Sequence, residues 1–239
     1  MLIGRDIVCL SMINRRLINT VNFKYEKYIG DPINTIRIFS EYNVDELILY
    51  DLKKKQLVDD DIKYIRKLAK YAGMPFTYGG GIKDAMEAEK LIRAGCDKIS
   101  INTTFFRNRS EVKNIIDTIG RQSISISINF VKNNGILLVC DNDCREIGPT
   151  VNEALDMAAE QNVGEVVLNN IQYDGTKFYN EPYQLLQIDP SYPFSLVYLG
   201  GNNFRLSADD LMDNRGVSYA TGSSYFLHGK HRAVLIRGK

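Results

Sequence analysis

The chain has 239 residues, and its hydrophobic fraction of 44% is sufficient for a large buried core. Its 30 basic and 29 acidic residues leave a net charge of +1, which gives no sign of a nucleic-acid partner. No apolar run reaches the ~18 residues of a membrane span, and the start lacks a signal-peptide core. We therefore expect a cytoplasmic protein that does not contact membranes.

Strands and helices alternate through the first half of the chain. Apolar, β-branched runs predict strands at residues 6–10, 47–50, 75–78 and 98–101. Apolar residues at helical spacing predict a helix after each strand. Asp31 and Pro32 begin the first of these helices, the third places Met86 and Leu91 inward, and the fourth is capped near Ser110.

The second half repeats this alternation. Its first strand, 123–129, alternates serine with isoleucine, so in a barrel the isoleucines occupy one face and the hydroxyls the other. A hairpin is predicted at 133–135, and a capping box, Thr150 with Glu153, opens the next helix. The remaining strands are expected at 166–168, 196–199 and 217–220, and no long final helix is evident.

Several segments recur about 120 residues apart, which indicates a duplicated half. The run 76–82 (FTYGGGI) corresponds to 197–203 (VYLGGNN), and 46–51 (ELILYD) corresponds to 165–170 (EVVLNN). A duplicated half of strand–helix units predicts an α/β fold, the (β/α)8 TIM barrel, as one domain over 1–239. Its half-barrels are expected at about 1–120 and 121–239.

Glycines and hydroxyls follow the predicted strands, at the end of a barrel where ligands bind. Bare backbone amides in such turns can approach an anion, and the repeat makes two symmetric pairs. We therefore expect a phosphorylated small-molecule ligand with two phosphates, the alternative being glycines that serve the turns alone. The candidate phosphate-binding residues are Gly80, Gly81, Asn102, Thr103, Gly200, Gly201, Gly222 and Ser223.

The four cysteines predict neither a disulfide framework nor a metal centre. Cys9 and Cys96 lie in or beside apolar strands and are expected to be small buried residues. Cys140 and Cys144 have no second cysteine or histidine pair to complete a tetrahedral site. No metal and no cofactor is expected.

Three motifs carry a resemblance to a known family. Residues 79–82 (GGGI), 97–102 (DKISIN) and 174–177 (DGTK) resemble the cyclase subunit of imidazole glycerol phosphate synthase, HisF, and the match extends from about residue 2 to 229. The resemblance implies a barrel that receives ammonia from a glutaminase partner, HisH, at its amino-terminal face. The ammonia then reacts with a bis-phosphorylated ribonucleotide at the other face.

The sequence departs from this family at the catalytic positions. Two aspartates perform the family's acid–base chemistry, and these positions are Ser11 and Asn129 here. Neither side chain exchanges a proton near neutral pH, and losing positioned acid–base catalysis typically costs ~10²–10⁴-fold. Asp51 and Asp174 remain at strand or loop ends and could bind a ligand hydroxyl, but they do not restore the missing pair, so cyclase chemistry is expected to be lost. They are the substitute acid–base candidates only if the protein is a cyclase after all.

The amino-terminal face keeps the family pattern. The resemblance implies an ammonia gate of four charged residues at the amino ends of strands, Arg5, Glu46, Lys98 and Glu165. Two cations and two anions converging on the barrel axis form a network that tolerates partial burial because it is paired.

The combination of the four gate residues with altered catalytic positions resembles a divergent HisF-like branch that is found with surface-polysaccharide genes. The tail, residues 228–236, also resembles that branch and contains His228 and His231. That resemblance implies ammonia supply, with a HisH-like glutaminase, to an N-sugar amidotransferase that converts an acetamido to an acetamidino group. Two alternatives stay open: a cyclase of histidine biosynthesis, and a non-catalytic phosphate-binding scaffold that activates a glutaminase.

Overall fold

A closed parallel barrel forms the centre of the computed structural model, which describes residues 5–21, 24–42, 44–141, 145–175, 191–199 and 218–222. Within these ranges the parallel strands are β1 (Asp6–Ile13), β4 (Glu46–Asp51), β5 (Phe76–Gly79), β6 (Lys98–Ile101), β7 (Ile124–Asn133), β10 (Glu165–Asn170), β11 (Ser195–Leu199) and β12 (Ser218–Gly222). Each strand pairs with the next, β7 pairs with β10, and β12 pairs with β1. The predicted (β/α)8 barrel is therefore confirmed, and it closes between its last and first strands.

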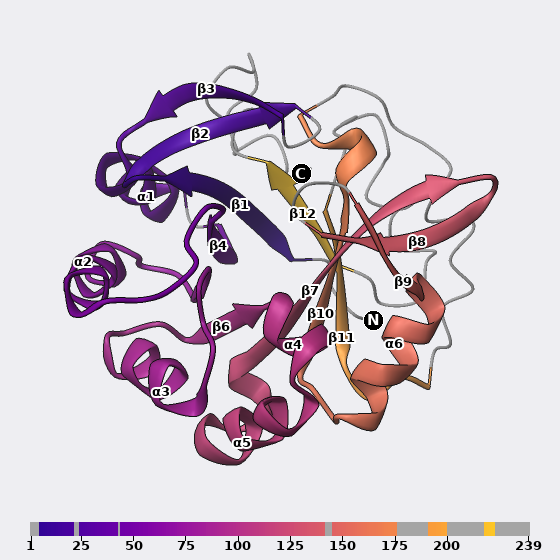
Figure 1. Cartoon of the computed structure of the whole chain (residues 1–239). Helices are drawn as coiled ribbons and strands as arrows, with labels where there is room; N and C mark the ends of the chain where they lie inside the picture. The colour runs from indigo at the N-terminus through magenta and orange to yellow at the C-terminus, as the bar shows by residue number, and fades with distance from the viewer. Residues whose placement is uncertain are drawn as a thin grey trace.

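The described helices lie on the outside of the barrel, along the strands from β1 to β10 (Figure 1). They are α1 (Pro32–Glu41), α2 (Asp59–Ala69), α3 (Ala85–Arg93), α4 (Thr103–Arg107), α5 (Arg109–Ile119) and α6 (Val151–Glu160), with short 3₁₀ turns η1 (Arg121–Ser123) and η2 (Ile171–Tyr173). As predicted, Asp31 caps α1, and Thr150 with Glu153 forms a capping box on α6. In the described ranges, no helix combines the length and apolarity needed to cross a bilayer.

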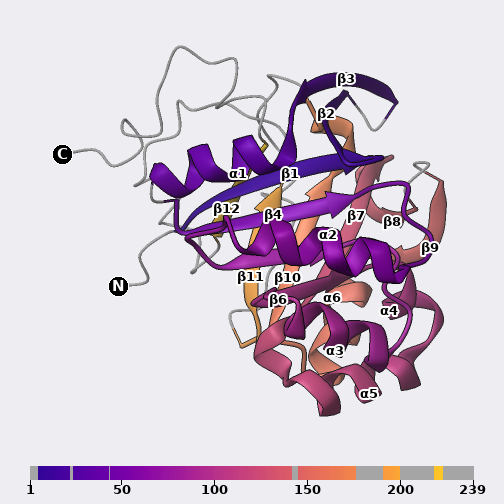
Figure 2. The ribbon, with the colours of Figure 1, turned by 90° about the vertical axis from the view of Figure 1, so that its left-hand side faces the viewer.

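Each half of the barrel carries an antiparallel extension after its first strand (Figure 2). β2 (Arg16–Val21) and β3 (Tyr25–Gly30) follow β1, while β8 (Ile136–Cys140) and β9 (Glu146–Thr150) follow β7. The hairpin predicted at 133–135 is confirmed. The predicted end of the first strand was wrong, because β1 continues to Ile13 and turns through Asn14 and Arg15, whose φ values are 51° and 59°.

The two faces of the barrel strands bury different side chains. The outward face packs on the helices through a large apolar cluster that includes Leu10, Leu49, Phe76, Ile126, Leu68, Val112 and Leu155. Each fully buried aliphatic side chain contributes about 1.5–3 kcal/mol to folding. The inward face has a small apolar cluster, Ile7, Cys9, Ile48, Val167 and Val197. The rest of the barrel interior is lined largely by polar residues. The whole interior, between the charged residues at one end and the strand ends at the other, is hereafter called the lumen.

Strand β7 shows why the lumen is polar. Its isoleucines join the outer cluster, and Ser125 and Ser127 are buried on the opposite face, as the alternation predicted. Two helix predictions were wrong in detail. Met86 is 63% exposed, because Ala88 and Leu91 form the buried side of α3. The side chain of Asn108, rather than Ser110, caps α5 by accepting from the amide of Glu111.

Candidate functional site

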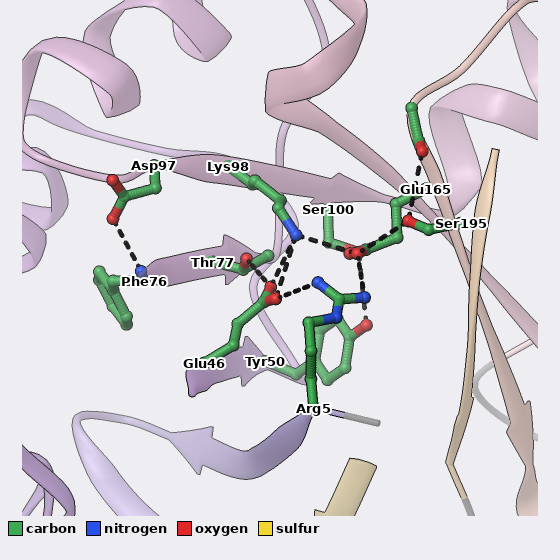
Figure 3. A network of polar contacts seen from close by, with 11 residues as sticks. Arg5, Glu46, Tyr50, Phe76, Thr77, Asp97, Lys98, Ser100, Glu165 and Ser195 are labelled. Carbon is green, nitrogen blue, oxygen red and sulfur yellow. Dashed lines mark hydrogen bonds and ion pairs between the residues drawn. The ribbon is translucent and has the colours of Figure 1, made fainter. Parts of the chain in front are cut away.

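Four charged side chains, hereafter the charged ring, meet at the amino-terminal end of the lumen (Figure 3). They come from Arg5, just before β1, and from the first residues of β4, β6 and β10: Glu46, Lys98 and Glu165. Arg5 donates to Glu46 at 2.7 Å and to Glu165 at 2.9 Å. Lys98 Nζ lies 3.0 Å from Glu46 Oε1 and 2.9 Å from Glu165 Oε2. Each cation therefore bridges both anions.

Neighbouring hydroxyls and amides hold the charged ring in place. Thr77 Oγ1 donates to Glu46 Oε1 at 3.0 Å, and Ser195 Oγ donates to Glu165 Oε2 at 3.3 Å. Asp97 accepts from the amide of Phe76 at 2.8 Å, which fixes the start of β6 against β5 (Figure 3). Thr77 and Ser195 could not be recognised from the sequence, since their role depends on the barrel's register.

The two carboxylates of the charged ring are buried. The side chains of Glu46 and Glu165 are each only 3% exposed, so neither carboxylate is solvated. Burial raises the pKa of Glu165, but the charges of Lys98 and Arg5, with their hydrogen bonds, hold it below its ordinary value. Both carboxylates depend on the two cations for compensation.

Tyr50 crosses the lumen further along its axis. Its phenol oxygen lies 3.4 Å from Ser100 Oγ, and its ring packs on the inner apolar cluster. A Cβ on Gly79 would lie 2.7 Å from this ring, so the glycine makes room for it. Burial raises the pKa of Tyr50, which therefore remains a neutral phenol. Sequence reasoning missed Tyr50, although it lies two positions after Ile48 on an inward face.

The family's two catalytic positions lie on inward faces near the carboxyl-terminal ends of β1 and β7. Asn129 is buried, and its side-chain oxygen accepts a hydrogen bond from Asn169 Nδ2 at 3.1 Å. Ser11 is two residues after the inward-facing Cys9 and is paired with Tyr50 in the sheet register. Hydroxyl and carboxamide groups can donate and accept hydrogen bonds, but they supply no acid–base pair near neutral pH.

Asp174 lies beside this end of the lumen. Its Oδ2 accepts from Thr20 Oγ1 of β2 at 2.6 Å. Burial, and secondarily the nearby charge of Asp174, raises the pKa of Cys9 on the inward face. The carboxylate is thus close to the lumen and bound to the first hairpin.

Asp51 lies on the other side of its strand. It follows the inward-facing Tyr50 and lines a cavity of about 380 Å³ between the β1–β2 turn, β4 and α2. Burial raises its pKa to about 6, partly offset by the charge of Lys54. The structure therefore separates Asp51 from Ser11 and Asn129 rather than bringing the three together.

The first glycine-rich segment packs closely on the β4–α2 loop. Gly80 and Gly81 have φ values of 143° and 69°, and a Cβ on Gly80 would lie 2.7 Å from the carbonyl oxygen of Asp51. Asn102 directly precedes α4, which begins at Thr103. The side-chain Nδ2 of Asn102 donates to the backbone carbonyl of Ser127 at 2.6 Å. Turn geometry and packing alone already require these glycines, so phosphate binding here stays a prediction.

Most of the second set of candidate phosphate-binding residues lies outside the part of the chain that the structure describes. Gly200, Gly201, Ser223, His228 and His231 are outside the described residues. Gly222 ends β12, opposite Cys9 of β1. In the described ranges, no group of three or more histidine, cysteine, aspartate or glutamate side chains is arranged to hold a metal ion.

Fold and site together define a class: a closed (β/α)8 barrel with a charged ring at the entrance of a polar lumen. Comparison with known proteins makes the class specific. The family described as "Histidine biosynthesis protein" matches residues 6–231. A Pseudomonas aeruginosa protein, provisionally named imidazole glycerol phosphate synthase subunit hisF2, is 38% identical over 236 residues, covering 97% of this chain and 94% of that protein.

Other relatives carry the same description. Imidazole glycerol phosphate synthase subunit HisF of Thermotoga sp. (strain RQ2) is 30% identical over 207 residues, covering 84% of this chain and 80% of that protein. A Leptospira borgpetersenii protein, provisionally named as a HisF subunit, is 31% identical over 241 residues, covering 99% of this chain and 95% of its own. The chain belongs to the histidine biosynthesis protein family, and within it to the HisF-like barrels.

Proposed function

We propose that this protein is the ammonia-conducting barrel subunit of a glutamine-dependent complex. The observation that carries the proposal is the charged ring, in which four side chains neutralise one another at the amino-terminal entrance of the lumen. Such a ring presents no net charge to a small neutral molecule. The polar side chains beyond it offer hydrogen bonds along the barrel axis.

The opposite end supports a conduit better than a cyclase. Ser11 and Asn129 stand where the family has aspartates, and the buried Asn129 is paired with Asn169. Asp174, the nearest substitute, is bonded to Thr20, while Asp51 faces away from the lumen. The chemistry that consumes the ammonia therefore belongs to another protein.

The partners follow from this assignment. A HisH-like glutaminase would dock at the amino-terminal face and release ammonia at the charged ring. We propose an N-sugar amidotransferase as the acceptor enzyme, in surface-polysaccharide biosynthesis, where nitrogen replaces the oxygen of an acetamido group to give an acetamidino group. The likeness of the tail, 228–236, to that branch supports this choice of acceptor.

Isotope dilution tests the conduit directly. The complex with its glutaminase and amidotransferase receives glutamine labelled with ¹⁵N at the amide, together with excess unlabelled ammonium chloride. A conduit delivers mainly ¹⁵N to the acetamidino product, whereas a scaffold that only activates the glutaminase delivers the isotope of the bulk solution. Product that matches the bulk isotope would refute the conduit.

A charge reversal tests gating, with glutamine hydrolysis as the check that the variant complex is folded and assembled. Lys98→Glu places a third anion in the charged ring, so in complexes that still hydrolyse glutamine it is expected to release the nitrogen to solvent. Lys67→Glu, on the exposed side of α2, is the matched control and should leave channelling unchanged. Equal ¹⁵N transfer by both variants would argue that the ring does not gate ammonia.

The names of the relatives favour a second candidate, the cyclase of imidazole glycerol phosphate synthase. It predicts that the purified barrel converts the family's bis-phosphorylated ribonucleotide to imidazole glycerol phosphate with ammonium chloride as nitrogen source. Turnover comparable to that of an ordinary HisF would support the cyclase. Absence of product, with the glutaminase complex intact, would support the conduit.

A further inference from the structure

Two buried polar atoms just inside the charged ring lack a hydrogen-bond partner among the described residues. Glu165 Oε2 accepts from Arg5, Lys98 and Ser195, but its other oxygen, Oε1, accepts from no group in the described part of the chain. The hydroxyl of Ser125 is likewise buried, with no hydrogen-bond partner in the ranges that the structure describes. An unsatisfied buried polar group costs about 1–3 kcal/mol, so two such groups together point to a ligand.

The sheet register brings the two atoms to one wall of the lumen. Ser125 is the register partner of Glu165 across the β7–β10 pairing, and neighbouring strands lie about 4.8 Å apart. Ser125 is also the partner of Ser100 on β6, whose hydroxyl meets the phenol of Tyr50. A row of polar groups therefore crosses the adjacent strands β10, β7 and β6: the carboxylate of Glu165, then the hydroxyls of Ser125 and Ser100. The phenol of Tyr50 meets the end of this row at Ser100.

The chemistry of this wall restricts the ligand. The free oxygen of Glu165 requires a donor and repels anions, while the hydroxyl of Ser125 can either donate or accept. The inner apolar cluster, with Ile7, Ile48 and Val167 among its members, packs on the same inward faces of the strands. A small molecule with several N–H donors satisfies both groups.

We propose that Glu165 Oε1 and Ser125 Oγ bind one ammonia or ammonium inside the charged ring, as a holding site between its release and its use. The carboxylate oxygen accepts one N–H, and the serine hydroxyl either accepts a second N–H or donates to the nitrogen lone pair of ammonia. The site deepens the proposed conduit and rests on it. It also gives Ser125 a positioning role that the charged ring does not require.

Thermal unfolding with three salts tests the site on the isolated chain. Ammonium chloride is compared at equal ionic strength with sodium chloride and potassium chloride, since potassium resembles ammonium in size but has no N–H donors. At ten times the dissociation constant, binding is expected to raise the melting temperature by about 3–6 °C with ammonium alone. Ser125→Ala should abolish this increment, and Ser127→Ala, the next inward position on β7, should retain it.

Isotope dilution supplies a second readout that does not depend on the stability of the variants. Ser125→Ala is expected to lower the share of glutamine nitrogen in the product at least twofold, with glutamine hydrolysis unchanged. An intact ammonium increment without any channelling would support the site and refute the conduit.

The opposite result is also informative. Equal melting temperatures in all three salts would overturn the holding site, even if channelling persists and the conduit stands. A crystal structure in which one water bridges Glu165 and Ser125, unchanged by ammonium, would overturn it as well, because a buried water also satisfies such groups.

Discussion

The two ends of the lumen differ in how they hold charge. At the amino-terminal end four charged side chains pair within the barrel, and two of them are 3% exposed. At the carboxyl-terminal end the inward positions that the structure describes include the neutral side chains of Ser11, Asn129 and Asn169. The acidic groups nearby lie beside the lumen or outside it.

This difference teaches that entrance and reaction site can change separately on one barrel. The charged ring depends on the first residues of four barrel strands or their approach, whereas the acid–base pair of a cyclase depends on the last residues of two. The two sets of positions share no residue, so the side chains of one set can differ while those of the other stay the same.

Removing one cation from the entrance is expected to have the largest effect. Lys98→Met leaves two buried carboxylates with Arg5 alone and should reduce the free energy of unfolding by about 3–5 kcal/mol. Arg93→Met breaks the exposed pair with Glu89 and should cost less than about 0.5 kcal/mol. Urea denaturation measures both variants, and a Lys98→Met protein within 1 kcal/mol of wild type, on the scale of an exposed pair, would contradict the buried network.

The carboxyl group outside the lumen should make stability depend on pH. The pKa of Asp51 is raised to about 6, so ionisation of this group destabilises the folded protein progressively between about pH 4 and pH 6 and fully above pH 6. As the pH falls from 8 to about 4, protonation removes up to about 3 kcal/mol of this cost, about half of it by pH 5, and stability rises. Glu165 acts at lower pH, since its pKa is depressed and its stabilisation is lost only in acid.

Urea midpoints at pH 5, 6, 7 and 8 measure this contribution. Asp51→Asn should flatten the profile and stabilise the protein most at pH 8. Asp45→Asn, at an exposed carboxylate before β4, is the control and should leave the profile unchanged. A steep profile retained by Asp51→Asn would assign the pH dependence to another group.

Placing carboxylates at Ser11 and Asn129 tests whether an acid–base pair at this end of the lumen supports cyclase chemistry. The double variant Ser11→Asp with Asn129→Asp is expected to increase ammonium-dependent turnover of the family's ribonucleotide by about 10²-fold over wild type. That gain corresponds to about 2.7 kcal/mol of activation free energy. Ser11→Asn, which adds a polar group without an ionisable proton, is the control. A wild-type rate that equals the double variant would show that other residues already supply the acid and base.

The smallest effect concerns the middle of the lumen. Gly79→Ala places a methyl group 2.7 Å from the ring of Tyr50 and should cost about 1–2 kcal/mol through overpacking. Tyr50→Leu should remove most of this cost, which a double-mutant cycle measures as a coupling energy. Additive effects of the two substitutions would mean that the ring does not constrain Gly79.

The barrel could be predicted from the sequence because its signals are local and repeated. The alternation of serine and isoleucine in β7 correctly gave both faces of that strand, and Asn133–Gly135 gave its hairpin. The equivalent hairpin after β1 was missed, because its turn places Arg15 rather than glycine at positive φ. In that conformation Arg15 contacts the carboxylate of Asp60 and the ring of Tyr64. Both residues belong to α2, which is far from Arg15 in the sequence.

The candidate site was predictable only in part. The four members of the charged ring followed from the family resemblance, and the structure brings them together. The outward position of Asp51 follows from period-two alternation along β4, in which Tyr50 faces inward. The unpartnered oxygen of Glu165 could not be predicted, because it depends on which atoms its neighbours reach.

The balance of charge in the ring has a consequence for transport. Two cations and two anions sum to zero, so the entrance exerts little long-range attraction on ions in solution. Screening by salt acts on exposed charges beyond a Debye length of about 8 Å at physiological ionic strength, and buried pairs are screened much less. The proposed passage of ammonia through this barrel should therefore be nearly independent of ionic strength, unlike electrostatically steered capture.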